Sequence, residues 1–185
     1  MGDLESKVTR RPRSKLERVL EQLEKHLSSP DPPQGSLSAA LTGGVDAARV
    51  AEFEQLARKN PAEARRRLLE FSRLEPASVD FLLLTIGADD TVAPSPTAQR
   101  VAARLGYPGT DYETLARALD AEVPEGDPGH VAWRAHHLLA AHGELVCGEP
   151  PACNRCPIRA LCSYHGEGPD PAARLTATSA RLHER

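Results

Sequence analysis

Residues 142–162, HGELVCGEPPACNRCPIRALC, contain every cysteine of the chain. Cys147, Cys153, Cys156 and Cys162 follow the spacing C-x5-C-x2-C-x5-C. Thiolates that come from one short loop can surround a single metal centre, because a two-residue gap brings sulfur atoms together without strain. We expect this loop to bind a metal and to be tied to the end of the helix before it. Metal binding would then contribute directly to folding.

Three states of the cysteines are compatible with the spacing alone. Zinc sites often use two facing CxxC knuckles, whereas here only Cys153 and Cys156 form such a pair. A [4Fe–4S] cluster offers four separate iron corners, which suits the isolated outer ligands Cys147 and Cys162 better. Unmetallated thiols are the third possibility. Disulfides are disfavoured in a reducing cytosol.

Composition narrows the class of protein. Apolar residues make up 40% of the sequence and aromatic residues only 4%, so Leu, Val and Ala must fill the core. The net charge of −3 gives no general attraction to nucleic acid, so any contact with DNA needs a local basic patch. No segment approaches the ~20 apolar residues of a membrane span. We therefore expect a cytoplasmic monomer that does not bind membranes.

The chain reads as all-α, without strand-like alternation. We expect a basic flexible arm (1–13), an N-terminal helix and linker (14–44), a helical region (45–143), the cluster loop (144–165) and a flexible tail (166–185). Cap residues, prolines and the spacing of apolar residues predict six helices. Two of them span residues 14–27 and 46–59, and the other four begin at Pro61, Pro76, Pro96 and Pro128. Thr110 and Glu113 predict a capping box for one more helix, and Gly143 is predicted to stop the last one.

Several motifs around the cysteines occur together in one known family. They are His142-Gly143 before the loop, Cys156-Pro157, Arg100-Val101 with Arg104-Leu105-Gly106, and Leu74 to Ser78. Over about residues 45–165 the chain resembles the iron–sulfur DNA glycosylases of the endonuclease III type, which belong to the HhH-GPD superfamily. The resemblance implies a helical HhH-GPD-like fold, a C-terminal [4Fe–4S] cluster and double-stranded DNA as a partner. The family separates its first two cysteines by six residues, whereas this chain has five. The short 28–45 segment implies that part of the six-helix lobe is missing.

The resemblance also shows where catalytic groups should stand. Family members that cleave DNA use a hairpin lysine as nucleophile, and that position falls on Asp80. The family's catalytic aspartate position falls on Ser95, and its hairpin glycines fall on Pro76 and Ser78. The only lysines are Lys7, Lys15, Lys25 and Lys59. Arginine stays protonated and cannot replace a lysine nucleophile, so lysine-dependent AP lyase chemistry is excluded on this hairpin.

A glycosylase that activates water would still need a carboxylate. Asp80 or the pair Asp89 and Asp90 could supply it, although the pair also reads as a solvated turn and Ser95 as a helix cap. Ser78, Arg155 and Arg159 are candidate DNA contacts, and Arg65 to Arg67 could bind phosphates or form a solvated helix face. His136, His137 and His142 are expected to pack or hydrogen-bond near the cluster.

Three functions remain open. The first is an endonuclease III-like cluster protein that binds DNA and has lost lesion chemistry. The second is an active monofunctional DNA glycosylase of base excision repair with a rearranged carboxylate. The third is an iron–sulfur redox or scaffold protein that binds no nucleic acid. The missing lysine and the net charge favour the first or third, and the basic N-terminal arm favours the first over the third.

Overall fold

The computed structural model describes residues 11–31, 47–70 and 74–166, and every regular element within these ranges is a helix. The α-helices are α1 (Lys15–Glu24), α3 (Ala47–Lys59), α4 (Pro61–Glu70), α5 (Pro76–Thr85), α6 (Pro96–Leu105), α7 (Tyr112–Asp120), α8 (Pro128–Leu145) and α9 (Ser163–Gly166). Two short 3-10 helices, η1 (Cys153–Arg155) and η2 (Arg159–Leu161), lie in the cysteine loop. The predicted all-α class is therefore confirmed. Most of the predicted arm, linker and tail lies outside the described residues.

Local capping explains where the helices begin. Ser14 and Glu17 form a reciprocal capping box, in which the Ser14 hydroxyl accepts from the Glu17 amide at 3.1 Å. The Asn60 side chain accepts from the Glu63 amide at 3.1 Å, immediately before the proline that opens α4. Ser95 accepts from the Ala98 amide at 3.3 Å and likewise precedes a proline. A cap side chain satisfies an amide that has no partner inside the helix.

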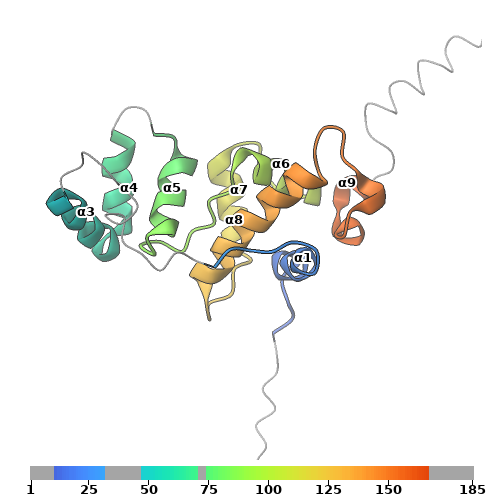
Figure 1. Ribbon diagram of the computed structural model, residues 1–185, viewed down its shortest axis with the longest axis horizontal. Coiled ribbons are helices and arrows are strands. Elements are labelled where there is room, and N and C mark those ends of the chain that lie inside the picture. Colours follow the sequence, from blue (N-terminus) through green and yellow to red (C-terminus); the bar gives the residue numbers. More distant parts are fainter. Residues whose placement is uncertain (1–10, 32–46, 71–73, 167–185) are drawn as a thin grey trace, which may run out of the picture.

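The main core forms where α1 and α6 pack against the long helix α8, with α7 packed on α6 (Figure 1). Leu138 and Leu139 at the centre of α8 are fully buried, and α1 contributes four apolar side chains to the same core. Trp133 is only 6% exposed and belongs to the same core. Burying a Leu side chain is worth about 1.5–3 kcal/mol, so this interface supplies much of the stability.

A second, smaller core joins α3, α4 and α5, with Ala57, Ala64, Val79, Leu83 and Ile86 at its centre. Figure 1 shows this three-helix end and the cysteine loop at opposite ends of the long axis, with α8 between them. Within the described ranges, only Leu74 and Leu145 are exposed large hydrophobic residues. No described helix is both long enough and apolar enough to cross a membrane.

Three predicted helix boundaries were wrong, one of them a start and two of them ends. The cap of α7 is Asp111, whose carboxylate accepts from the Thr114 amide at 2.9 Å, and not Thr110. Helix α1 ends at Glu24, before the predicted limit at Leu27. Helix α8 continues through Gly143 to Leu145. This glycine is required by packing, because a Cβ there would lie 2.3 Å from the Thr97 side chain on α6.

Candidate metal centre

The cysteine loop begins where α8 ends. The His142 carbonyl accepts the Cys147 amide at 2.8 Å, which turns the chain out of the helix. The turns η1 and η2 follow, and each closes on a cysteine, since the Cys156 amide donates to the Cys153 carbonyl at 3.4 Å and the Cys162 amide closes η2. Backbone turns therefore determine the path of the loop and the direction of its thiols.

All four thiols line one cavity between the loop, α6 and α8. Cys147 is buried, the other three are half-buried, and none forms a disulfide. In the described part of the chain, no group of three or more His, Cys, Asp or Glu side chains is arranged to hold a metal ion. Four thiols that line one cavity are a donor set that suits a tetrahedral zinc ion, or a cluster with one thiolate for each of four iron corners.

Two arginines of α6 hold the first cysteine in place. Arg104 Nη1 donates to the carbonyls of Cys147 and Gly148 at 2.9 and 2.8 Å, and lies 3.3 Å from the Cys147 sulfur. Arg100 donates to the Gly143 carbonyl at 3.2 Å and to the Cys147 carbonyl at 3.3 Å. Neither arginine was predicted as a site residue. Their spacing of four, which places both side chains on one face of α6, was the signal available.

One histidine reaches the thiols. His142 is 1% exposed, its Nε2 lies 3.6 Å from the Cys156 sulfur, and burial lowers the pKa of its ring to about 4. Its Nδ1 is buried and has no hydrogen-bond partner among the described residues. His136 and His137 instead pack against one another, and the His136 ring stacks on Phe81 at 4.1 Å between centroids. Three histidines were predicted to pack or hydrogen-bond near the cluster, and His142 is the one that contacts a cysteine of the loop.

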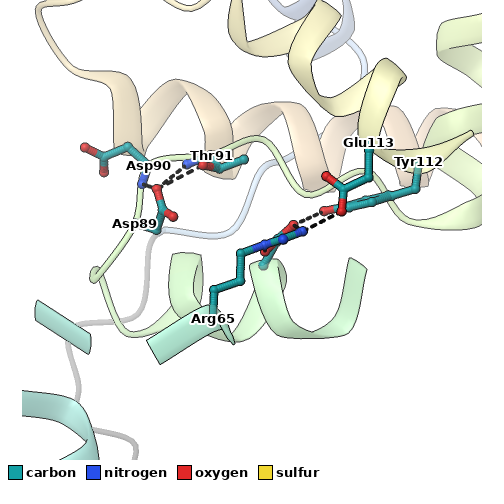
Figure 2. Close-up of polar contacts among 7 residues, drawn as sticks. Arg65, Asp89, Asp90, Thr91, Tyr112 and Glu113 are labelled. Atoms are coloured by element: carbon teal, nitrogen blue, oxygen red, sulfur yellow. Dashed lines mark hydrogen bonds and ion pairs between the residues drawn. The ribbon is translucent and has the colours of Figure 1, made fainter. Parts of the chain in front are cut away.

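Asp80, which the resemblance predicted to stand at the family's lysine position, is buried in a network that joins α4, α5 and α7. Arg65 donates to both oxygens of this carboxylate, at 2.6 and 3.0 Å, and the Tyr112 hydroxyl donates at 2.9 Å. Arg65 also pairs with Glu113 at 2.7 Å (Figure 2). These contacts raise the pKa of Arg65 above its ordinary value, with the hydrogen bonds to Asp80 as the largest cause. A carboxylate with three donors is poorly suited to deprotonate water.

The other candidate carboxylates belong to a turn. Asp89 accepts from the Asp90 amide at 2.8 Å and from the amide and hydroxyl of Thr91 at 3.3 and 2.9 Å (Figure 2). The side chain of Asp89 thus stabilises its own loop, as short acidic side chains do in turns. Ser95, which the resemblance predicted to stand at the family's aspartate position, caps α6. The structure does not bring Asp80, Asp89 and Ser95 into one hydrogen-bonded site.

The candidate phosphate contacts fall into two groups with different charge environments. Arg65 to Arg67 on α4 all pair with carboxylates, which are Asp80 and Glu113 for the first and Glu63 for the other two. The two loop arginines are exposed and bond to neutral acceptors, Arg155 to the Leu145 carbonyl at 3.1 Å and Arg159 to His165. Positive charge is therefore retained at the cysteine loop and largely offset on α4. Ser78 lies in the first turn of α5, with its amide bonded to the Glu75 carbonyl at 3.0 Å.

Comparison with known proteins gives one partial likeness. No protein-family model matches the chain. Over 70 residues it is 33% identical to endonuclease III of Sulfolobus acidocaldarius, a match that covers 36% of this chain and 30% of that protein. The chain is similar to endonuclease III over that segment. Because the match covers less than a third of its relative, the activity and partners of the whole protein are proposals for this chain.

Proposed function

We propose that this protein is a shortened relative of endonuclease III that holds a [4Fe–4S] cluster on its four cysteines, binds double-stranded DNA and lacks lysine-dependent lyase chemistry. The single observation that carries the proposal is the cavity lined by Cys147, Cys153, Cys156 and Cys162. Its thiols form no disulfide, and the single CxxC pair with two isolated outer cysteines favours four iron corners over zinc. The likeness to endonuclease III supports the same assignment.

The surroundings of the cavity suit a cofactor of negative charge. Four thiolates around an iron–sulfur core leave a net negative charge, which a nearby cation stabilises. Arg104 supplies that charge at 3.3 Å from the Cys147 sulfur. Ile158 and Cys147 belong to the apolar core, so the loop side of the cavity is continuous with the packed interior. The cluster would therefore act chiefly as a structural tie between the loop and α8.

Loss of lyase chemistry follows from the residues at the hairpin. Asp80 occupies the nucleophile position and is neutralised by Arg65. No lysine occurs after Lys59 anywhere in the sequence. An active glycosylase would need a carboxylate aimed at a bound base, whereas Asp80 and Asp89 are both engaged in contacts within the protein. These contacts count against the monofunctional glycosylase and leave binding or scaffold roles.

Metal analysis of anaerobically purified protein tests the cofactor. We expect about four irons per chain and a broad absorption band near the visible–ultraviolet boundary, typical of iron–sulfur proteins. Stoichiometric zinc without iron would refute the cluster. Glycosylase assays on damaged duplexes should show no base release, and release that an Asp80→Asn variant abolishes would establish the enzymatic alternative.

Salt-dependent DNA binding tests the partner. Binding to a short duplex should weaken steeply with salt, by a slope of about −0.9 for each phosphate contact. The double variant Arg155→Gln, Arg159→Gln should reduce that slope by about 2. The matched control, Arg66→Gln with Arg67→Gln on α4, should leave it unchanged because carboxylates already offset those charges. Complete absence of binding at low salt would favour the redox or scaffold role.

A further inference from the structure

His142 separates the cysteine cavity from a second groove on the outside of the loop. It lines the cavity together with all four cysteines. It also lines the outer groove, whose other residues include Leu27, Leu145 and Arg155. The side chain is 1% exposed, so it is part of the wall between the two spaces. A polar ring in this position has few partners available to it.

The contacts of the ring assign its hydrogen. Nε2 lies 3.6 Å from the Cys156 sulfur, within the usual range for a hydrogen bond to sulfur, whereas Nδ1 has no partner among the described residues. Once Cys156 is a ligating thiolate it can only accept a hydrogen bond, which would place the ring hydrogen on Nε2. The backbone of the same residue accepts the Cys147 amide at 2.8 Å. One residue thus contacts both the first and the third cysteine of the loop.

We propose that His142 is a positioning residue that donates its Nε2 hydrogen to the Cys156 thiolate, and so raises the reduction potential and slows the loss of the cluster. The inference depends on the proposed function, because it needs iron on the four cysteines. A hydrogen bond withdraws charge from the sulfur and stabilises the more negative, reduced form. Groups that orient metal ligands in this way commonly affect metal retention about 10- to 100-fold when removed.

Other polar groups at the cavity are less suited to this role. Arg104 holds Cys147 mainly by its carbonyl, with two shorter bonds to backbone oxygens than to sulfur. His165 also lines the cavity, but its Nε2 faces the Arg159 guanidinium and must accept there. The Cys156 thiol has one further donor, the Ile158 amide. His142 therefore supplies the side-chain hydrogen bond to this cysteine.

The test compares two substitutions of His142 with a matched control. His142→Phe keeps a ring but removes the donor, and His142→Gln keeps an N–H at a similar reach. His137→Phe is the control, because His137 lies on the same helix and its Nε2 has no hydrogen-bond partner among the described residues. We expect His142→Phe to lower the midpoint potential in protein-film voltammetry and to lose iron to a chelator roughly tenfold faster. His142→Gln and His137→Phe should remain close to wild type.

A measurement on the wild-type protein tests the same hydrogen bond even if a His142 variant fails to fold. Protein labelled with ¹⁵N-histidine and brought to a paramagnetic cluster state should show a nitrogen coupling in pulsed electron paramagnetic resonance. The coupling should persist in His165→Gln and disappear in His142→Gln. Iron-loaded wild type without this coupling, or with a potential unchanged in His142→Phe, would overturn the role of His142 alone. Wild type that binds no iron would overturn the proposed function and this role together.

Discussion

Arg65 and Asp80 form a two-pronged ion pair between α4 and α5, with Nε to Oδ1 at 2.6 Å and Nη2 to Oδ2 at 3.0 Å. Tyr112 of α7 adds a third donor to the same carboxylate. Asp80 thus joins three helices, which is a role in helix packing.

Breaking this pair should destabilise the fold. Arg65→Gln would leave Asp80, which is 4% exposed, without its cation, and we expect unfolding to become easier by about 3 kcal/mol. Urea denaturation followed by circular dichroism measures this change. Arg66→Gln, one position along α4 and exposed, is the control and should have little effect. Equal losses in the two variants would show that the buried pair has no special role.

Gly143 should not tolerate a side chain. An alanine Cβ would lie 2.3 Å from Thr97 Cγ2 and 3.1 Å from Val101 Cγ2, so α6 and α8 would have to separate. We expect Gly143→Ala to lower the unfolding free energy by about 1–3 kcal/mol, although alanine favours helices. Gly126→Ala is the control, because a Cβ there meets nothing within 4 Å. A stabilised Gly143→Ala protein would contradict the close crossing.

Because of Asp120, the free energy of unfolding should fall as the pH rises from about 4 to about 6. Burial, followed by the charges of Asp89 and Asp80, raises its pKa to about 6, against the hydrogen bond from the Val92 amide. The folded state then holds a proton that the unfolded state releases, so this contribution is complete below pH 4 and lost above pH 6. Asp120→Asn should flatten that part of the stability profile, measured by denaturation at several pH values. An unchanged profile would mean that Asp120 titrates normally.

Removing one thiol should remove the cofactor. Cys153→Ser is expected to give colourless, poorly soluble protein, because the loop loses the metal that ties it to α8. Iron analysis and the visible spectrum of the soluble fraction measure this. Asn154→Ser, the exposed neighbour in the same turn, should purify like wild type. A stable brown Cys153→Ser protein would contradict the ligand assignment.

Reaction with an abasic site should leave no covalent adduct. Lyases form a Schiff base between lysine and the sugar, and borohydride reduces it to a stable cross-link. Because the sequence has no lysine after Lys59 and the proposed nucleophile position is Asp80, we expect no cross-link on a duplex with an abasic site. A true lyase run beside it provides the positive control. A cross-link that disappears in Lys59→Gln would show that another lysine has taken over.

Much of the helical fold could be predicted because helix starts are local events. Pro61, Pro76, Pro96 and Pro128 were each predicted to open a helix from their immediate neighbours, and each does so in the structure. The error at Thr110 arose because two adjacent residues can both accept from the helix amides, and only the backbone decides between them. The error at Gly143 arose because the sequence shows a glycine but not the helix that crosses it.

The candidate site likewise has one part that was predictable from the sequence and one part that was not. The cysteine spacing predicted that four thiols lie together, and they line one cavity. The partners of these thiols and of Asp80 were not predictable, since Arg104 is 43 residues from Cys147 and Tyr112 is 32 residues from Asp80. Such contacts depend on how α6 and α7 pack, and no short-range pattern encodes them.

By itself, the sequence determined the all-helical class, the gathering of the four cysteines and the absence of a lysine at the hairpin, because each depends on residue type and on neighbours a few positions away. Only the tertiary structure decided that Asp80 is neutralised by Arg65, that His142 meets Cys156, and that positive charge is retained at Arg155 and Arg159. The reason is physical: the energy of a buried charge or a hydrogen bond to sulfur depends on which distant groups packing brings within a few ångströms.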